Sequence, residues 1–237
     1  MSTYDKKQPF LKHIHELRSR ILASLFFIFL FSAAGYLLRE KLLDLLLKPI
    51  GTTLIYTSPA GAINFIFKIS FIFGLFCTIP VILYEVFKFI SPIFSTNQLK
   101  RALVLLIFST ILLLSGAIFA YLVILPASFN FLTEFSSDKL SPLISTESYL
   151  DFVTAYLLGF GVIFQLPLIL IFLNFFYKLS SKVLIKYLRY IVLFSFIFSA
   201  IITPTPDFLN QCLIALPFII LYIFSILIVW IINRLRK

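Results

Sequence analysis

Six long apolar segments constrain this chain more than any other feature of its sequence. They lie at about residues 21–38, 63–90, 102–125, 152–176, 185–202 and 209–232. A run of about 20 apolar residues lets a helix cross the hydrocarbon core of a bilayer. The strands of a membrane β-barrel would instead alternate apolar and polar residues in segments of about ten. The pattern therefore predicts an all-α, polytopic membrane protein with six transmembrane helices, forming one domain over residues 1–237.

The composition excludes the other broad classes of protein. The chain is 61% hydrophobic and 13% charged, whereas soluble domains are about 25% charged. Its 30 Phe and 11 Tyr residues give it too much apolar surface for a disordered chain. Cys77 and Cys212 are far apart in the sequence, which favours packing roles over a disulfide.

The distribution of basic residues predicts how the chain is oriented. Most of the 20 Lys and Arg residues precede the first span, follow the second or fourth span, or follow the sixth. The positive-inside rule therefore favours both termini in the cytoplasm. The net charge of +10 is then explained by contact with anionic lipid rather than with nucleic acid. A cleaved signal peptide is a weaker alternative, because the apolar run from Ile21 to Leu38 exceeds a usual signal core.

The connections on the predicted outer side are the longest. Residues 39–48 mix leucines with charged residues, a pattern typical of a short helix at the membrane interface, and Pro49 follows as a stop. Residues 127–150 contain the turn signals Ser136-Ser137-Asp138 and Ser141-Pro142. Neither side has room for a catalytic domain.

Polar residues inside the apolar segments are candidates for function, because an unpaired polar group is costly in hydrocarbon. Gln165 lies in the fourth segment, two residues before Pro167, which should loosen the helix. The residues alone favour a helix–helix hydrogen bond at Gln165, and a docking point for another membrane helix is the alternative. Glu85 and Lys88 have the spacing of a pair on one helix face.

The sequence contains no recognisable catalytic set. His13 and His15 have no further ligands at the spacing of a metal site. A phosphate-binding glycine loop, a nucleophile elbow and a Ser/His/Asp set are all missing from the sequence. We therefore expect no enzyme activity, no metal and no cofactor.

Short motifs recur along the chain, and together they resemble a known family. They are His13-x-His15-Glu16-Leu17-Arg18-Ser19-Arg20, Lys48-Pro49, Pro80-Val81-Ile82-Leu83-Tyr84, Phe89-Ile90-Ser91-Pro92, Gly159-Phe160-Gly161, Gln165-Leu166-Pro167, and Thr203-Pro204-Thr205-Pro206-Asp207 with Gln211. They resemble the motifs of TatC, the multispan subunit of the twin-arginine protein translocase. The resemblance covers all six spans in order.

The resemblance implies a receptor and assembly platform. TatC binds the paired arginines of signal peptides on folded cargo at the cytoplasmic face. It recruits single-span TatA- and TatB-type subunits, and the proton-motive force drives transport. The resemblance further implies a homo-oligomer within a larger complex, contact with membrane lipid and no binding of nucleic acid. It places the chain in the bacterial cytoplasmic membrane or in the membrane of an organelle that encodes its own subunit.

The resemblance also assigns roles to individual residues. It assigns signal-peptide binding to Glu16, Arg18, Phe89, Pro92 and Gln98. It assigns partner-helix or structural roles to Pro49, Gln165, Asp207 and Gln211. Glu16 is the first choice for contact with arginine, because a carboxylate can accept two hydrogen bonds from the planar guanidinium fork.

Three positions depart from the family pattern. The family commonly has glutamate where this chain has Gln98, Gln165 and Ile223. Gln98 can still accept a hydrogen bond but carries no charge, so either the twin arginine binds less tightly or a partner acid comes from elsewhere. A small-solute transporter or channel is the main alternative function, but it predicts a repeat between the two halves that the sequence does not show. A third alternative, an intramembrane enzyme, would need a catalytic pair that the sequence does not show.

Overall fold

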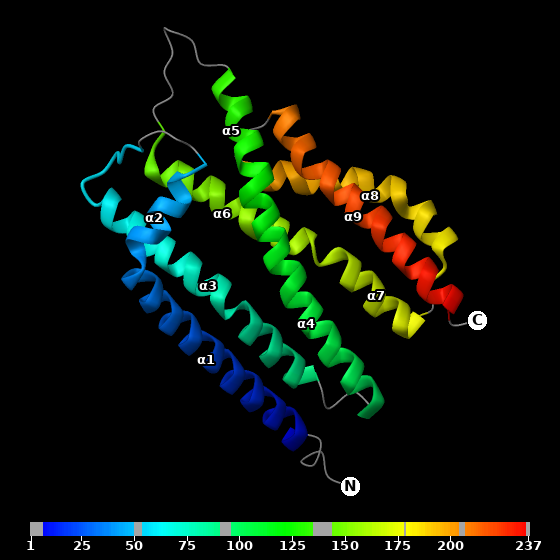
Figure 1. Cartoon of the computed structure of the whole chain (residues 1–237). Helices are drawn as coiled ribbons and strands as arrows, with labels where there is room; N and C mark the ends of the chain where they lie inside the picture. The colour runs from blue at the N-terminus through cyan, green and yellow to red at the C-terminus, as the bar shows by residue number, and fades with distance from the viewer. Residues whose placement is uncertain are drawn as a thin grey trace. The chain divides into compact units, whose positions relative to one another are not determined.

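The computed structural model describes residues 7–49, 54–90, 96–134, 144–177, 179–203 and 207–235 (Figure 1). Within them, the side chains of residues 7–13, 90, 96–102, 133–134 and 175–176 lie outside the description. The chain forms two compact units. The first unit contains residues 1–44 and 63–110, and the second contains residues 45–62 and 111–237.

The described residues are mostly helical, as the apolar pattern predicts. The helices are α1 (Lys7–Leu37), α2 (Arg39–Leu47), α3 (Gly61–Ile90), α4 (Thr96–Phe119), α5 (Leu125–Glu134), α6 (Thr146–Ile163), α7 (Leu166–Tyr177), α8 (Ser181–Ile202) and α9 (Phe208–Leu235). In this part of the chain, six helical stretches are long and apolar enough to cross a membrane: α1 from Ile14, α3, α4 with α5, α6 with α7, α8 and α9. The predictions of an all-α fold and six spans are confirmed.

Helices α1 and α3 of the first unit pack closely against each other, side by side (Figure 1). A Cβ on Gly74 would lie 2.2 Å from the Ser32 Oγ and 2.6 Å from the Ser32 backbone nitrogen. Nearer the start of α3, the Tyr36 and Phe67 rings stack with centroids 5.9 Å apart. Contacts that advance along α1 move backward along α3, so the two helices are antiparallel.

The third span extends further than the sequence indicates. A π-helical turn, Ala120–Ile124, joins α4 to α5, and α5 then continues to Glu134. The wider turn accommodates Pro126, which has no N–H to donate within a regular helix. Residues 127–134, which the sequence places in an outer connection, are therefore helical. The turn signals predicted at residues 136–138 and 141–142 lie outside the described residues.

The fourth span is interrupted where the sequence predicts that Pro167 loosens it. Helix α6 ends at Ile163, and the Gln165 N–H donates to the Val162 carbonyl at 3.0 Å, a tightened turn. Helix α7 then begins at Leu166. Helix α4 approaches this interruption closely, because a Cβ on Gly116 would lie 2.5 Å from the Phe160 carbonyl oxygen.

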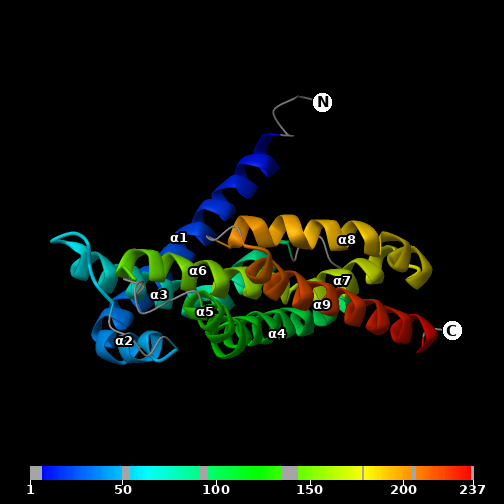
Figure 2. The same ribbon diagram turned by 90° about the horizontal axis from the view of Figure 1, so that it is seen from above.

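Helices α8 and α9 form an antiparallel pair within the second unit, as both views show (Figures 1 and 2). The Ser199 hydroxyl donates to the Gln211 carbonyl at 2.7 Å, close to the turn between them. Further along, the Tyr222 hydroxyl donates to the Leu184 carbonyl at 3.0 Å. These two hydrogen bonds fix the register of the pair.

Helix α2 is the short helix that residues 39–48 predict. The carbonyls in the last turn of a helix lack partners within it. Two tyrosine hydroxyls supply partners here: Tyr121 donates to the Leu45 carbonyl at 2.5 Å, and Tyr149 donates to the Leu46 carbonyl. Beyond α2, Ile55 forms an isolated parallel bridge with Ser145, just before α6.

Candidate arginine-binding site

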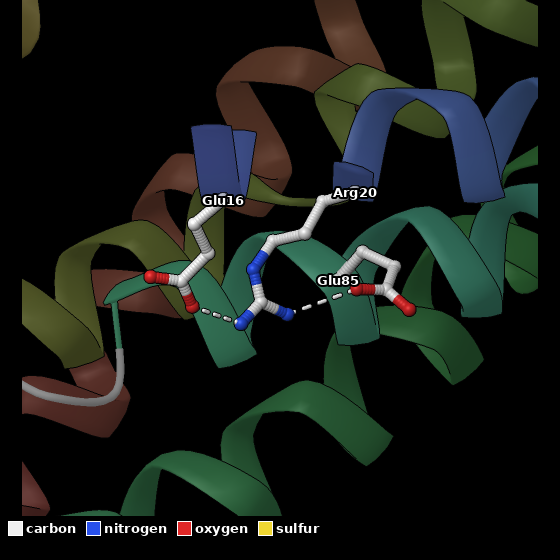
Figure 3. Close-up of polar contacts among 3 residues, drawn as sticks. All are labelled: Glu16, Arg20 and Glu85. Carbon is white, nitrogen blue, oxygen red and sulfur yellow. Dashed lines mark hydrogen bonds and ion pairs between the residues drawn. The ribbon is translucent and has the colours of Figure 1, made fainter. Parts of the chain in front are cut away.

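A cluster of three charged side chains joins α1 to α3 (Figure 3). Arg20 on α1 donates from Nη1 to Glu85 Oε2 on α3 at 2.9 Å. Its Nη2 donates to Glu16 Oε1, one turn earlier on α1. One guanidinium therefore lies between two carboxylates that come from different helices.

The sequence explains why these three side chains meet. Glu16 and Arg20 are four residues apart, so they lie on the same face of α1. Small residues such as Ser32 and Gly74 allow α1 and α3 to approach closely, and their antiparallel register places Glu85 beside Arg20. Glu16 lies near the start of the first span, and Glu85 lies near the end of the second. All three therefore lie at one end of this helix pair.

The cluster is partly withdrawn from its surroundings. The side chains of Arg20, Glu85 and Glu16 are 13%, 19% and 35% exposed. A charge near the end of a membrane span is costly unless it is paired, so these contacts matter more than those of a fully exposed ion pair. The Arg20 Nε atom is buried and has no hydrogen-bond partner in the described structure.

The two carboxylates of the cluster hold one guanidinium, that of Arg20. Two carboxylates and one guanidinium leave one surplus negative charge when all three are ionised. Among the described residues, no three His, Cys, Asp or Glu side chains come together as a metal site would require. The donors and acceptors of the cluster are those of arginine recognition.

Four of the five predicted signal-peptide residues, all except Pro92, lie in described helices of the first unit. Glu16 belongs to the cluster, whereas Arg18 is exposed on α1. Phe89 is half-buried, one turn beyond Glu85 on α3. Gln98 lies in the first turn of α4, but its side chain is outside the described residues, as is Pro92.

Sequence reasoning missed Arg20 as a central member of the cluster and missed the contact from Glu85 to α1. It predicts that Glu85 pairs with Lys88 on α3, and that pairing stays a prediction. The structure gives Glu85 an ion pair with Arg20 and places the Lys88 ammonium 6.0 Å from the Tyr84 ring centroid. The signal that could have found the cluster was an acid at the same end of each of two consecutive spans, with an arginine four residues after one of them.

The second group of predicted residues lies around helix ends. Asp207 caps α9: its Oδ1 accepts from the Asn210 N–H at 2.7 Å, and its Oδ2 accepts from the Asn210 side chain at 2.9 Å. Gln211 supplies the carbonyl that Ser199 binds. Gln165 is half-buried in the interruption between α6 and α7, and Pro49 follows α2.

Comparison with known proteins identifies the family. The sequence model of "Sec-independent protein translocase protein (TatC)" matches residues 12–217. A TatC from Koribacter versatilis is 35% identical over 235 residues, covering 93% of this chain and 84% of that protein. A TatC from Helicobacter pylori strain J99 is 34% identical, covering 95% and 90%. An uncharacterised tatC-like protein, ycf43, from Pyropia yezoensis is 32% identical, covering 94% and 88%.

The fold agrees with these matches. A crystal structure of the twin-arginine translocase receptor TatC is 30% identical, with a TM-score of 0.77, and the match covers 92% of this chain and 98% of that one. A second crystal structure of that receptor, in the detergent DDM, gives a TM-score of 0.79 at 30% identity and covers 91% and 98%. The chain is therefore an integral membrane protein that belongs to the TatC family of Sec-independent protein translocases.

Proposed function

We propose that this protein is the receptor subunit of a twin-arginine translocase, a transport component rather than an enzyme. One observation carries the proposal beyond family membership: Glu16 and Glu85 already hold the guanidinium of Arg20 between them. The same acceptors suit the paired arginines of a signal peptide, because carboxylates bind guanidinium groups through charged hydrogen bonds. A solute transporter, the alternative considered from the sequence, has no comparable support.

The proposed orientation has both termini in the cytoplasm, in a bacterial cytoplasmic membrane. Basic side chains lie over aromatic rings at ends predicted to face the cytoplasm. Arg189 is 4.7 Å from the Tyr190 ring centroid, and Arg234 is 5.4 Å from that of Trp230. Aromatic and basic residues are typical of the membrane–water interface. Arg39 is likewise 5.1 Å from the Tyr36 ring centroid at the end predicted to lie outside, so these contacts mark the two interfaces, and the proposed orientation rests on the charge distribution.

The proposed partners are single-span TatA- and TatB-type subunits, signal peptides of folded cargo, and further copies of this chain. Large apolar faces are available for such helices. Within the described structure, only 6% of an 18-residue apolar stretch of the first span is buried. The buried share of the corresponding stretch of α8 is 11%. Lipid covers such faces when no partner helix does. Gln165 and the interruption beside it are the proposed polar contact for a partner.

Complementation tests the proposal. The chain should restore export of a twin-arginine reporter in a bacterial strain that lacks TatC, when its own single-span subunits are expressed with it. A reporter whose two arginines are replaced by lysines is the matched cargo control. Failure to export the arginine reporter, with all subunits present in the membrane, would contradict the proposed function.

Glu16 provides the residue-level test of the same proposal. Replacing Glu16 with Ala should abolish crosslinking of a twin-arginine peptide, because the peptide loses its charged acceptor. Insertion into the membrane should be unchanged, since Glu16 is the most exposed member of the cluster, at 35%. A peptide that crosslinks to Glu16→Ala at wild-type strength would remove Glu16 from the binding site.

A further inference from the structure

We propose that Glu85 is a second arginine acceptor, which binds the signal peptide together with Glu16. This inference rests on the proposed function and names the residue that provides its second negative charge. The sequence motifs point only to Glu16 as an acid at this site. The structure adds Glu85, which lies 65 residues further along the chain and on another helix.

The contact with Arg20 shows that Glu85 can bind a guanidinium where it stands. Its Oε2 accepts from Arg20 Nη1 at 2.9 Å, within the range of a charge-assisted hydrogen bond. Arg20 uses only this oxygen. Within the described residues, the other oxygen, Oε1, has no hydrogen-bond donor, and Figure 3 shows it directed away from Arg20. Glu85 therefore keeps an acceptor for a second guanidinium.

The charge of the cluster favours a second cation. The two carboxylates carry two negative charges, and the Arg20 guanidinium carries one positive charge. The Glu85 side chain is only 19% exposed, and a charge near apolar surroundings is screened less than one in water. Gln98 offers no charge at the position where the family commonly has glutamate. Glu85 supplies a negative charge near the end of α3. It is the partner acid from elsewhere that the sequence analysis expects, because Gln98 is uncharged.

The placement of the two acids suits a pair of adjacent arginines. Glu16 on α1 and Glu85 on α3 contact the Arg20 guanidinium through different nitrogens, so they approach it from different directions (Figure 3). Glu85 remains 19% exposed and Glu16 35% exposed, which leaves both acids accessible to a peptide.

The test measures peptide binding to the full-length protein in lipid nanodiscs. One fluorescent signal peptide contains two arginines, and a matched peptide contains two glutamines in their place. The variants are Glu85→Gln, which keeps the shape of the side chain but removes its charge, Glu16→Gln, and the control Glu147→Gln. Glu147 is exposed in the first turn of α6, in the second unit.

We expect Glu85→Gln to lower the affinity for the arginine peptide about tenfold, since a charged acceptor becomes a neutral one. Its affinity for the glutamine peptide should not change. Glu147→Gln should leave both affinities at the wild-type values. Adding Gln98→Glu to Glu85→Gln should recover part of the lost affinity by restoring a negative charge.

The outcomes separate this inference from the proposed function. If the wild type binds both peptides equally, the receptor function itself is wrong. If Glu16→Gln weakens arginine binding but Glu85→Gln behaves like the control, Glu85 is no acceptor and the function stands. Equal weakening of both peptides by Glu85→Gln would assign Glu85 to helix packing alone, which also overturns the inference.

A second measurement uses the unmodified protein and so does not depend on the folding of a variant. A photoreactive residue beside the two arginines of the peptide should crosslink to α3 around Glu85 as well as to α1. Adducts confined to segments other than α3 would overturn the inference.

Discussion

Arg20 is the residue on which the charge cluster depends. Arg20 pairs with both carboxylates: its Nη1 donates to Glu85 and its Nη2 donates to Glu16. Each carboxylate contacts only one of these two nitrogens. Removing one carboxylate leaves an ion pair of zero net charge. Removing Arg20 instead leaves two neighbouring carboxylates with no cation between them, near the end of a membrane span. The three positions are therefore unequal in their effect on stability.

Replacing Arg20 with Gln should lower the free energy of unfolding by about 2 kcal/mol, less than for a fully buried pair because some exposure remains. Glu16→Gln should cost less than about 1 kcal/mol, because Glu16 is one-third exposed. Thermal unfolding in detergent measures both, and Arg20→Lys is the control that keeps the charge. Unfolding temperatures of Arg20→Gln and Glu16→Gln that both equal the wild-type value would show that the cluster does not stabilise the helix pair, and equal losses in the two variants would contradict the special role of Arg20.

At the level of helices, close backbone approach determines which side chains meet. Gly74 is the tightest point between α1 and α3, because a Cβ there would lie 2.2 Å from the Ser32 Oγ and 2.6 Å from the Ser32 nitrogen. The Ser32 hydroxyl can rotate away, but the backbone nitrogen cannot. The glycine therefore maintains the spacing that lets Arg20 reach Glu85.

Gly74→Ala should separate α1 from α3 locally and lower the unfolding temperature of the protein. It should also weaken binding of the twin-arginine peptide, although it lies several turns from Glu85. Gly161→Ala is the matched control, since its Cβ would lie 3.5 Å from Leu113 Cγ, an ordinary contact. The prediction fails if the two alanine variants have the same unfolding temperature and the same peptide affinity.

The interruption between α6 and α7 leads to a prediction about partners. Gln165→Leu should be tolerated for folding, because the side chain is only half-buried and the interruption is set by the backbone and Pro167. It should weaken recruitment of a single-span subunit, since the amide is the proposed bridge to that helix. Copurification of the single-span subunits with the variant measures this. A wild-type yield of partner would favour a packing role for Gln165.

The sequence predicts these helices better than it predicts the contacts between them. Each span depends on local apolar length, and the short helix α2 depends on a local mixture of leucines and charges. The extension of the third span depends on a π-helical turn before Pro126, which proline alone does not specify. The ion pair between Arg20 and Glu85 depends on the register of two helices. The local spacing rule predicts that Glu85 pairs with Lys88 on the same helix, and it carries no information on how α1 and α3 are aligned.

At the scale of the whole molecule, the bilayer acts as the solvent, and α8 fits it poorly. Helix α8 has 22 residues, but Lys182, Lys186 and Arg189 lie in its first half. The uninterrupted apolar part from Tyr190 to Ile202 spans about 20 Å, against a hydrocarbon thickness of about 30 Å. Arg189 lies over the Tyr190 ring, as expected for a residue at the interface.

The register of α8 against α9 makes this mismatch specific. Leu184 is level with Tyr222, and Ser199 is level with Gln211. Arg189 is therefore level with a part of α9 between Gln211 and Tyr222, well inside a helix that continues to Leu235. The exposed Arg189 can reach water from this depth if the bilayer thins locally. Alternatively, a partner helix can cover Arg189 and shield it from lipid. We therefore expect thinned membrane beside α8, and we expect partner helices to gather there.

Lengthening α8 tests this expectation. Inserting four apolar residues after Phe196 should remove the mismatch, but it also rotates the rest of the helix. Inserting seven apolar residues nearly preserves the helical face and separates length from rotation, since an α-helix has 3.6 residues per turn. Both variants should export less twin-arginine cargo and retain less single-span subunit, because a longer α8 no longer thins the bilayer. If both elongated proteins transport cargo and hold their partners as well as the parent, the short apolar length of α8 has no role in assembly.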